Sequence, residues 1–408
     1  MDYKWILLGL AAMTMFLQQG TRQAFGAVLP QIKLDFQSLG VTEVGLGFVG
    51  SVMSAVYAVA AIGMAFAADF FGRKRVIVLG LLFLSAGMLL CGLARSLGLL
   101  ILGYGVLNAI GQSSLGPAVS SLVSRYHVKS RATALSVFQA AVYLGIVGSA
   151  VCSGWLGGLG PGRWRIAFLS FAVLCAVGAF VDGWGVRDLP SAETDGRPRL
   201  RDAALAMLGR PSAVLHTLAF GFFMFAGIGY GIWAPAFLQS EFSASPTAAG
   251  LHAMLWHMLG AFAGVAVGGR ISDKLAARRP GARLEIGIAG LLASVPFVVL
   301  AAYAKSLPLC CVALAFWGFM RGLYDANVYA AFYSVVVQRY WTSAAGLFAS
   351  FAFLMSSLAP VLLGWIGREF SLRSSIASLA VFYLLGAVLM VVQRFLTFAR
   401  DFVREDRA

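Results

Sequence analysis

The sequence predicts an all-α integral membrane protein with twelve transmembrane helices in two pseudo-symmetric halves of six. Composition, apolar run length and an internal repeat support this prediction. Of the 408 residues, 60% are hydrophobic and 12% are charged, whereas roughly a quarter of the residues of a soluble domain are charged. Apolar runs of about 20 residues, long enough to cross a bilayer as a helix, follow one another along the chain. Lipid offers the backbone no hydrogen bonds, so these runs must be helical.

The first apolar run follows Lys4 directly, as the core of a signal peptide would. No small-residue cleavage site follows it, and the run continues to Pro30, so we interpret it as the first span. The twelve predicted spans are residues 4–30, 43–68, 76–94, 97–124, 132–159, 164–186, 213–239, 247–269, 286–304, 307–336, 342–367 and 374–398.

The positions of the 31 Lys and Arg residues predict the orientation of these spans. With the N-terminus inside, 22 of them fall in inner segments and seven in outer loops. This bias predicts a multi-pass protein of the plasma (inner) membrane with both termini cytoplasmic. We interpret the net charge of +14 as loops that set topology and contact anionic membrane lipids, and expect no nucleic-acid partner.

A polar, proline-containing segment after the sixth span divides the chain. The predicted organisation is an N-terminal six-helix bundle (1–186), a cytoplasmic linker (187–212), a C-terminal six-helix bundle (213–398) and a cytoplasmic tail (399–408). The two bundles are similar in sequence at an offset of 204 to 206 residues, for example at Gly26 and Gly231, Pro30 and Pro235, Gly45 and Gly250, and Asp69 and Asp273. Such a repeat implies a pseudo-two-fold axis along the membrane normal and a central site between the halves.

Two loop motifs carry a family resemblance. DFFGRKR (69–75) resembles the loop between helices 2 and 3 that marks the major facilitator superfamily, and GGRISDKLAARR (268–279) is similar to its second copy. The first copy has Phe70 where a basic residue is usual, and the second has Ala276 for the glycine. With the twelve spans, this resemblance covers nearly the whole chain and implies the major facilitator fold.

The same loops contain candidate gating residues. Asp69, at the end of a helix, can accept hydrogen bonds from the N-terminus of a neighbouring helix and pair with Arg73 or Arg125. Such contacts exist only while the inner face is closed, so they would latch the outward-open state. Asp273 and Arg339 occupy the corresponding places in the second half. The alternative is that these loop charges only orient the protein.

Two basic residues belong to neither the inner segments nor the outer loops: Arg22 in the first helix and Arg321 in the tenth. Arg22 lies about 27 Å along its helix and Arg321 about 21 Å along its own, so both reach the middle of the membrane. Two guanidinium groups from opposite halves can converge on one cavity, where they match a carboxylate or a phosphate. We therefore expect a small organic anion as substrate. The alternatives are a packing role for Arg22 and a permanent ion pair of Arg321 with Asp325.

Polar and aromatic side chains in other spans suit the hydroxyl or carbonyl groups of a solute. Each of them could instead bond helices together. Besides the two arginines, the candidate substrate-binding residues are Gln18, Phe25, Asn108, Gln112, Gln139, Tyr143, Tyr230, His252, Trp256, Tyr324 and Asn327.

The tenth helix divides into two faces by its period. Arg321, Tyr324 and Asp325 lie on one face, whereas the small residues Gly318, Gly322, Ala326 and Ala330 recur on another. We expect the small face to pack closely on a partner helix and the ionic face to line the cavity.

Asp325 is the acidic residue near mid-depth and the first candidate for proton coupling. A carboxyl group beside an arginine can gain a proton when substrate takes over the arginine, which would link substrate to proton binding. His252 and His257 are the other titratable candidates. Asp182, close to the end of the sixth span, is interpreted as a boundary residue.

The pair Thr21-Arg22 and the segment RGLYDAN (321–327) resemble the organic-anion branch of the superfamily, the anion:cation symporters. The resemblance implies that Arg22 contacts the acidic group of the substrate. Many members of that branch have Asp directly before this arginine. Here that position is Thr21, so the resemblance implies no proton-binding residue in the first helix.

Other classes of protein are disfavoured. The sequence has no Walker-type phosphate loop, so transport would be secondary, by alternating access and without ATP or another cofactor. No nucleophile and base set or metal-ligand spacing indicates an enzyme or a metal site, and the five cysteines are interpreted as small core residues. A receptor is disfavoured because the sequence shows no appended signalling domain. We expect the protein to be a monomer.

The favoured function is proton-coupled symport of a carboxylate or sugar acid. Exchange of organic anions or sugar phosphates is the alternative. A multidrug exporter of cations is disfavoured because the arginines would compete for the carboxylate that such a pocket needs.

Overall fold

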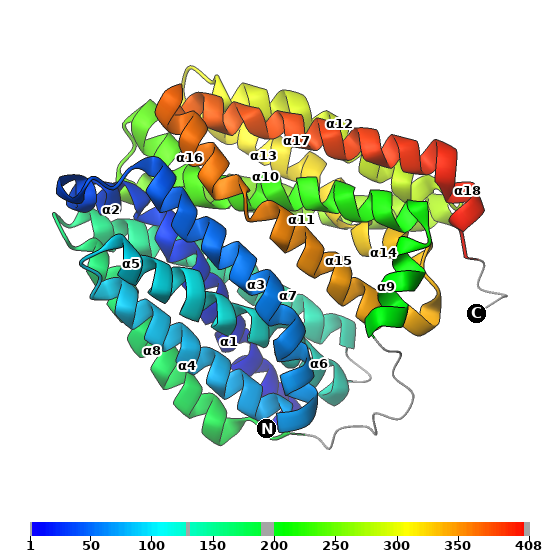
Figure 1. The fold of residues 1–408 in the computed structure, drawn as a ribbon, viewed down its shortest axis with the longest axis horizontal. Helices are drawn as coiled ribbons and strands as arrows, with labels where there is room; N and C mark the ends of the chain where they lie inside the picture. Colours follow the sequence, from blue (N-terminus) through cyan, green and yellow to red (C-terminus); the bar gives the residue numbers. More distant parts are fainter. Residues whose placement is uncertain (1, 128–130, 189–199, 404–408) are drawn as a thin grey trace. The chain divides into compact units, whose positions relative to one another are not determined.

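In its described residues, the first half of the chain consists of helices joined by short connections. The computed structural model describes residues 2–127, 131–188 and 200–403, and it contains no strand among them (Figure 1). The first half consists of α1 (Tyr3–Ala27), α2 (Leu29–Phe36), η1 (Gln37–Leu39), α3 (Glu43–Phe71), α4 (Arg73–Gly92), α5 (Leu97–Leu100), the π-helix η2 (Ile101–Asn108), α6 (Ala109–Tyr126), α7 (Arg131–Gly158) and α8 (Trp164–Gly185).

The second half begins with a helix that the sequence analysis did not predict, α9 (Leu200–Leu208), within the expected linker 187–212. Residues 189–199 of that linker lie outside the described residues. The remaining elements are α10 (Pro211–Phe242), α11 (Pro246–Ala276), α12 (Ala282–Ala302), α13 (Leu307–Asp325), α14 (Val328–Tyr333), η3 (Gln338–Tyr340), α15 (Trp341–Ser356), α16 (Ala359–Glu369), α17 (Leu372–Val392), the π-helix η4 (Gln393–Thr397) and α18 (Phe398–Asp401).

These elements form the twelve predicted membrane-crossing segments. Eleven stretches of the described chain are long and apolar enough to span a bilayer. The twelfth is α1, whose 25 residues exceed the required length but include Gln18, Gln19, Arg22 and Gln23. These polar residues lower the hydropathy of α1. The prediction of the fold class is confirmed.

The chain forms two compact units that do not follow the chain order. Unit 1 contains Met1–Thr194 together with Gly231–Met254 and Pro360–Arg368, and unit 2 contains Asp195–Tyr230, Leu255–Ala359 and Glu369–Ala408. In unit 1, α1 packs along α7 and α4 along α8. In unit 2, α12 packs on α13 and α17. The predicted boundaries of the two bundles remain a prediction.

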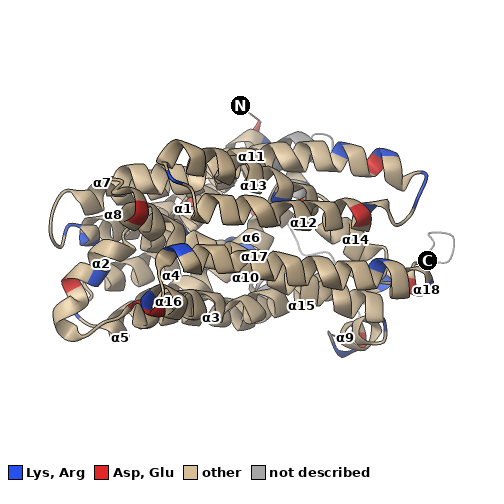
Figure 2. Ribbon diagram, turned by 90° about the horizontal axis from the view of Figure 1, so that it is seen from above, with Lys and Arg blue, Asp and Glu red and all other residues tan. Residues whose placement is uncertain are grey.

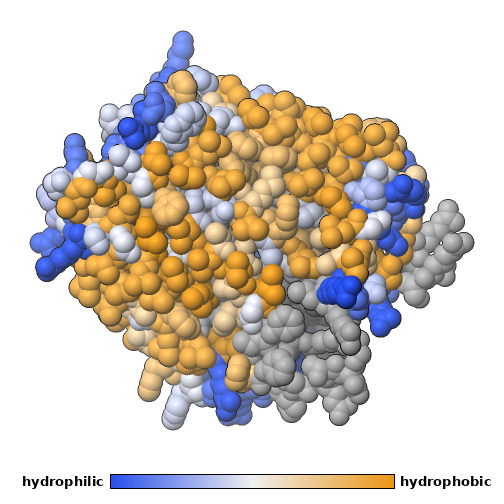
Figure 3. Space-filling model, viewed as in Figure 1, coloured by the Kyte–Doolittle hydropathy of each residue, from blue (hydrophilic) through white to orange (hydrophobic). Residues whose placement is uncertain are grey.

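The outer faces of the helices are apolar, as lipid requires. Along α8, the side chains of Val173, Val177, Phe180 and Trp184 recur on one face and are 52% to 90% exposed. Apolar residues dominate the surface in Figure 3, and Figure 2 shows the charged residues mostly near the helix ends. On the opposite face of α8, Asp182 is fully buried. Its place three residues before the end of α8 agrees with the expected position near the end of the span, and its role as a boundary residue remains a prediction.

The five cysteines do not share one environment. Cys91, Cys175, Cys310 and Cys311 are buried, as expected for small core residues, whereas Cys152 on α7 is exposed. The core interpretation is wrong for Cys152 because its side chain lies on the outward face of the helix.

Glycine allows α11 and α13 to approach each other closely. A Cβ atom at Gly318 would meet the carbonyl oxygen of His257, and one at Gly322 would meet that of Ala261. From the other side, a Cβ atom at Gly264 would meet the carbonyl oxygen of Phe319. The prediction that the glycine face of the tenth membrane helix packs on a partner helix is confirmed, and the partner is α11. We call this contact the glycine seam.

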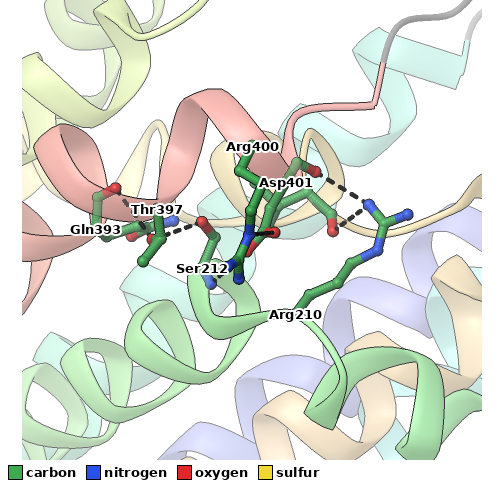
Figure 4. A network of polar contacts seen from close by, with 7 residues as sticks. Arg210, Ser212, Gln393, Thr397, Arg400 and Asp401 are labelled. Atoms are coloured by element: carbon green, nitrogen blue, oxygen red, sulfur yellow. Dashed lines mark hydrogen bonds and ion pairs between the residues drawn. The ribbon is translucent and has the colours of Figure 1, made fainter.

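A polar network in unit 2 ties the start of α10 to the end of the last helix (Figure 4). Asp401 Oδ2 accepts a hydrogen bond from the backbone N–H of Ser212 at 2.9 Å, and the Ser212 hydroxyl lies 2.7 Å from that of Thr397. Arg210 donates to the carbonyl oxygens of Val335 and Asp401. Because the first N–H groups of a helix lack partners within it, Asp401 acts as a remote cap for α10.

The first testable consequence concerns this cap. Asp401→Ala is expected to lower the stability of the protein by about 1–2 kcal/mol, because it leaves the buried N–H of Ser212 without its acceptor. Thermal unfolding of the detergent-purified protein measures the effect. Arg400→Ala is the matched control, since the Arg400 side chain pairs with Asp401 but is 67% exposed, and it should change little. Equal effects of the two variants would contradict the capping role.

Candidate functional site

Arg321 is held by three groups inside unit 2. Its Nη2 lies 3.3 Å from Asp325 Oδ2, one helical turn later on α13. Its Nη1 lies 3.0 Å from His257 Nε2 on α11, and its Cζ lies 5.0 Å from the centre of the Phe223 ring on α10. The side chain of Arg321 is only 19% exposed. The guanidinium group is thus shared between a carboxylate, an imidazole and an aromatic face.

The contact with Arg321 fixes the protonation state of His257 in this arrangement. A guanidinium group has donors only, so His257 Nε2 must accept the hydrogen bond and carry no proton. His257 is therefore neutral, with its proton on Nδ1. Binding of a proton to Nε2 would require the bond to Arg321 to break.

Buried aromatic rings surround His257 and Arg321. The rings of Tyr230 and Trp317 lie 4.8 and 4.7 Å from the His257 ring, and the Tyr324 ring lies 4.7 Å from that of Phe223. The Tyr324 hydroxyl is buried and has no hydrogen-bond partner among the described residues. The cluster combines a cation, an acid and rings whose polar atoms could bind a solute.

The structure thus brings four predicted residues into one cluster, namely Tyr230, Arg321, Tyr324 and Asp325. Asn327 is buried after the end of α13, and its amide donates to the carbonyl oxygen of Leu323. Trp256 is half-buried beside His257 in the chain.

His257 is predicted from the sequence only as a titratable alternative, but in the structure it contacts Arg321 directly. A signal was present in the sequence. His257 shares a helical face with Gly260 and Gly264, and this face forms the glycine seam with α13. A histidine on a face that packs so closely on the helix of Arg321 is placed to contact the arginine.

Arg22 lies in unit 1, half-buried on α1. Its carbonyl oxygen accepts a 2.7 Å hydrogen bond from the Tyr104 hydroxyl, and the Tyr104 ring stacks on Phe25 with 4.5 Å between centroids. Phe25 and Tyr104 are therefore aromatic neighbours of this arginine.

Two of the predicted polar residues join helices in this conformation. Gln18 Nε2 donates to the Gln112 carbonyl oxygen, and Gln112 Nε2 donates in return to the Gln18 carbonyl oxygen, both at 2.6 Å. Gln112 also donates to the Thr21 hydroxyl. This pairing supports the alternative that both glutamines connect α1 to α6.

The other predicted residues of the first half differ in exposure. Asn108, the last residue of the π-helix η2, is fully buried, and neither of its amide atoms has a hydrogen-bond partner among the described residues. π-Helical turns are frequent at functional sites, so Asn108 keeps its candidate role. On α7, Gln139 is exposed and Tyr143 is half-buried, as is His252 on α11.

Unit 1 contains direct contacts between segments of the two halves of the chain. A Cβ atom at Gly47 of α3 would meet the carbonyl oxygen of Pro360 at the start of α16, and one at Gly250 of α11 would meet that of Ala150 on α7. Gln31 of α2 donates to Gln239 of α10 at 3.0 Å. We call these contacts the closed end of unit 1.

Asp35 anchors α2 at the closed end. Its Oδ2 accepts hydrogen bonds from Arg165 Nη1 at 2.5 Å and from the Trp164 ring N–H at 2.9 Å. Burial alone would raise the pKa of this carboxyl, but the hydrogen bonds and the charge of Arg165 hold the pKa below its usual value.

Two predicted gating residues of the first half lie around the connection between α3 and α4. The side chain of Asp69 lies outside the described residues. Instead, Asp188 accepts a 3.1 Å hydrogen bond from the Lys74 N–H at the start of α4, next to Arg73. This start follows Gly72, whose φ of +86° is unfavourable for other residues.

The remaining gating candidates also lie at helix ends. Asp273 is exposed and pairs with Arg283 at 3.1 Å. Arg125 is half-buried near the end of α6, and Arg339 is exposed in η3. Their gating role remains a prediction.

Comparison with known proteins now identifies the family. The model of the major facilitator superfamily matches residues 11–282 and 217–401. The chain belongs to the major facilitator superfamily. The major facilitator fold is also found in the inward-facing, unoccupied crystal structure of a bacterial homolog of the human lysosomal transporter Spinster. That structure matches with a TM-score of 0.85 and 20% sequence identity, over 99% of each chain.

Two curated proteins are similar to nearly the whole chain. A cis,cis-muconate transport protein of Acinetobacter baylyi is 27% identical over 88% of this chain and 87% of its own. An MFS-type efflux pump of Mycolicibacterium smegmatis is 28% identical over 99% of this chain and 95% of its own. The superfamily membership makes this chain a multi-pass membrane transporter.

The second prediction concerns pH. Because the pKa of Asp35 is lower in the folded than in the unfolded chain, its charge stabilises the fold above the unfolded pKa, and this contribution disappears as the pH falls through the folded pKa. Asp35→Asn should therefore cost roughly 1–2 kcal/mol near neutral pH and progressively less below about pH 4.

Thermal unfolding at a series of pH values measures this difference. Asp2→Asn is the control, because the Asp2 carboxylate is 62% exposed in its pair with Lys4 and should contribute little at any pH. A deficit of Asp35→Asn that stays constant into the acid range would refute the ionic anchor.

Proposed function

We propose that this protein is a secondary active transporter of a small organic anion, a carboxylate or a sugar acid, coupled to protons by symport. The observation that carries the proposal is the position of Arg321 between Asp325 and His257. An arginine within a membrane-spanning helix is a candidate for function because its charge is costly there. Here the two groups that hold it are both able to bind a proton.

The geometry of the ion pair favours exchange for a substrate. The 3.3 Å contact between Arg321 and Asp325 is longer than the 2.7–2.9 Å typical of charge-assisted bonds, and it engages one nitrogen. A substrate carboxylate that bound the planar guanidinium group through two parallel hydrogen bonds would compete well with Asp325.

Displacement by substrate would create the demand for a proton. Once a substrate anion occupies Arg321, Asp325 loses its cationic partner in a poorly hydrated site, and its neutral form becomes favourable. One proton would then enter with one carboxylate. His257 is the second acceptor, since loss of its bond to Arg321 exposes Nε2, and His252 is a third candidate on the same helix.

Arg22 is proposed as the second anion-binding group. It lies half-buried on α1 beside Phe25 and Tyr104, and the relative named for cis,cis-muconate transports a molecule with two carboxylates. Two arginines would suit a dicarboxylate. Asn108 and Tyr324, whose buried polar atoms lack partners among the described residues, would bind its remaining polar atoms.

Alternating access is the proposed mechanism, supported by the closed end of unit 1. There the backbones of helices from both halves touch through Gly47 and Gly250, and these contacts must separate for a solute to enter from that side. We further propose that both termini are cytoplasmic, as the distribution of basic residues predicts, and that the closed end faces outward.

Export is the second candidate, because the similar M. smegmatis protein is named an efflux pump. Anion exchange is the third. Direction of transport and dependence on a proton gradient separate these possibilities, and both are measurable with purified protein in liposomes.

The third prediction tests the arginines. Arg22→Lys and Arg321→Lys should each reduce uptake of radiolabelled cis,cis-muconate, or of another dicarboxylate found by screening, by more than about tenfold, since lysine keeps the charge but loses the bidentate geometry. Arg279→Lys, at an exposed position, should retain wild-type uptake. Normal uptake by both membrane-helix variants would exclude an anion clamp.

The fourth prediction tests coupling. Asp325→Asn should abolish accumulation driven by an inward proton gradient but retain counterflow of labelled against unlabelled substrate, because asparagine imitates the protonated acid. His257→Gln is compared in the same assay. Wild-type counterflow that ignores pH would support exchange instead, and gradient-driven accumulation by Asp325→Asn would transfer the coupling role to a histidine.

A further inference from the structure

Asp182 lies in a cavity of unit 1 that the proposed transport site does not use. The cavity is small, about 10 Å³, and is lined by side chains of α1, α4, α6 and α8, among them Leu7, Ile77, Val119 and Leu122. Asp182 itself has no exposed surface. Among the described residues that line the cavity, Asp182 is the one ionisable group and Thr14 the one other polar side chain.

The hydrogen bonds of Asp182 suit a neutral acid better than a carboxylate. Its Oδ2 lies 2.6 Å from the Thr14 hydroxyl, and that hydroxyl also lies 2.9 Å from the Leu10 carbonyl oxygen. A hydroxyl group has one hydrogen to donate. If Asp182 carries its proton on Oδ2, it donates to Thr14 and Thr14 donates to Leu10, so each hydroxyl hydrogen has an acceptor.

A charged Asp182 would be poorly satisfied. A carboxylate has acceptor sites on both oxygens, yet Asp182 Oδ1 has no hydrogen-bond partner among the described residues, and no cation lines the cavity. Burying a charge without a counter-ion costs several kcal/mol, and a carboxyl group in such a place takes up a proton instead.

We propose that Asp182 is a proton-binding site of the N-terminal half, occupied in this conformation, and that its deprotonation loosens α1 from α8. A carboxylate here would draw water into the cavity, and the water would separate the helices that line it. The same end of the bundle is held by Tyr3, whose hydroxyl donates to the Gly185 carbonyl oxygen and accepts from the Arg187 N–H.

Thr14, the hydrogen-bond partner of Asp182, lies on α1, the helix that carries Arg22. Thr14, Gln18 and Thr21 follow one another at helical spacing on α1, and all three are buried. The protonation of Asp182 therefore influences how α1 is seated against α6 and α8. The proposal concerns protons and helix packing, and it holds whether or not Arg22 and Arg321 bind an anion.

Thermal unfolding of the full-length protein from about pH 5 to about pH 9 tests the proposal. The unfolded chain releases the Asp182 proton above about pH 4, so the native state of the wild type loses stability as the pH rises, whereas Asp182→Asn lacks this dependence. The Tm of Asp182→Asn should exceed that of the wild type by an amount that grows with pH, by about 2 °C or more over this range.

Asp273→Asn is the matched control, because the Asp273 carboxylate is 74% exposed, and its Tm difference should stay flat. A Tm of Asp182→Asn below that of the wild type throughout, or a difference independent of pH, would show a stabilising carboxylate and overturn the proposal.

Infrared spectroscopy gives an independent readout that needs no Asp182 variant. At about pH 5 the wild type should show the C=O band of a buried protonated carboxyl group, and Thr14→Val should shift that band because the acid loses its acceptor. A spectrum in which Thr14→Val leaves every protonated-carboxyl band unchanged contradicts the assignment.

Discussion

Lipid cannot hydrogen-bond to a polar group, and this constraint decides where the polar side chains of the membrane-spanning helices lie. α8 illustrates it, because Phe180 and Trp184 project outward while Asp182, between them in the chain, is fully buried. On α1, Thr14, Gln18 and Thr21 are buried and bond to α8 or α6. Inside such a bundle a polar group must find a partner, lose its charge or bind a ligand. The proposed roles of Arg321, Asn108 and Asp182 all follow from this choice.

Much of the fold could be predicted from the sequence because membrane helices depend on local features. Run length alone locates the twelve spans, and the four-residue recurrence of small residues predicts that Gly318 and Gly322 lie at a helix contact. α9 was missed because its nine residues are too short and mixed to stand out within a polar segment. The membership of Gly231–Met254 and Pro360–Arg368 in unit 1 was also beyond prediction, since it depends on contacts between distant parts of the chain.

The charged residues of the candidate site were predicted from the sequence, but the contact between Arg321 and His257 was not. Arg321 and Asp325 are separated by one helical turn, so their contact follows from helix geometry. The bond from Arg321 to His257 joins residues 64 positions apart, and its prediction would have required knowing which helices are neighbours. The burial of Asp182 was missed for a related reason. Its position near a helix end indicated the membrane boundary, but which side chains of α8 are buried is set by packing against α1, α4 and α7.

The glycine seam between α11 and α13 has a mechanical consequence. With carbonyl oxygens of each helix against the glycine Cα atoms of the other, the two helices have no intervening side chains that could change rotamer to absorb sliding or rotation. The two helices are expected to move as one rigid pair, with His257 on α11 and Arg321 on α13. Movement of the surrounding helices would then leave the His257–Arg321 spacing unaltered. The hydrogen bond between them would then break on protonation of His257 or on binding of an anion to Arg321, and would be little affected by movement of other helices.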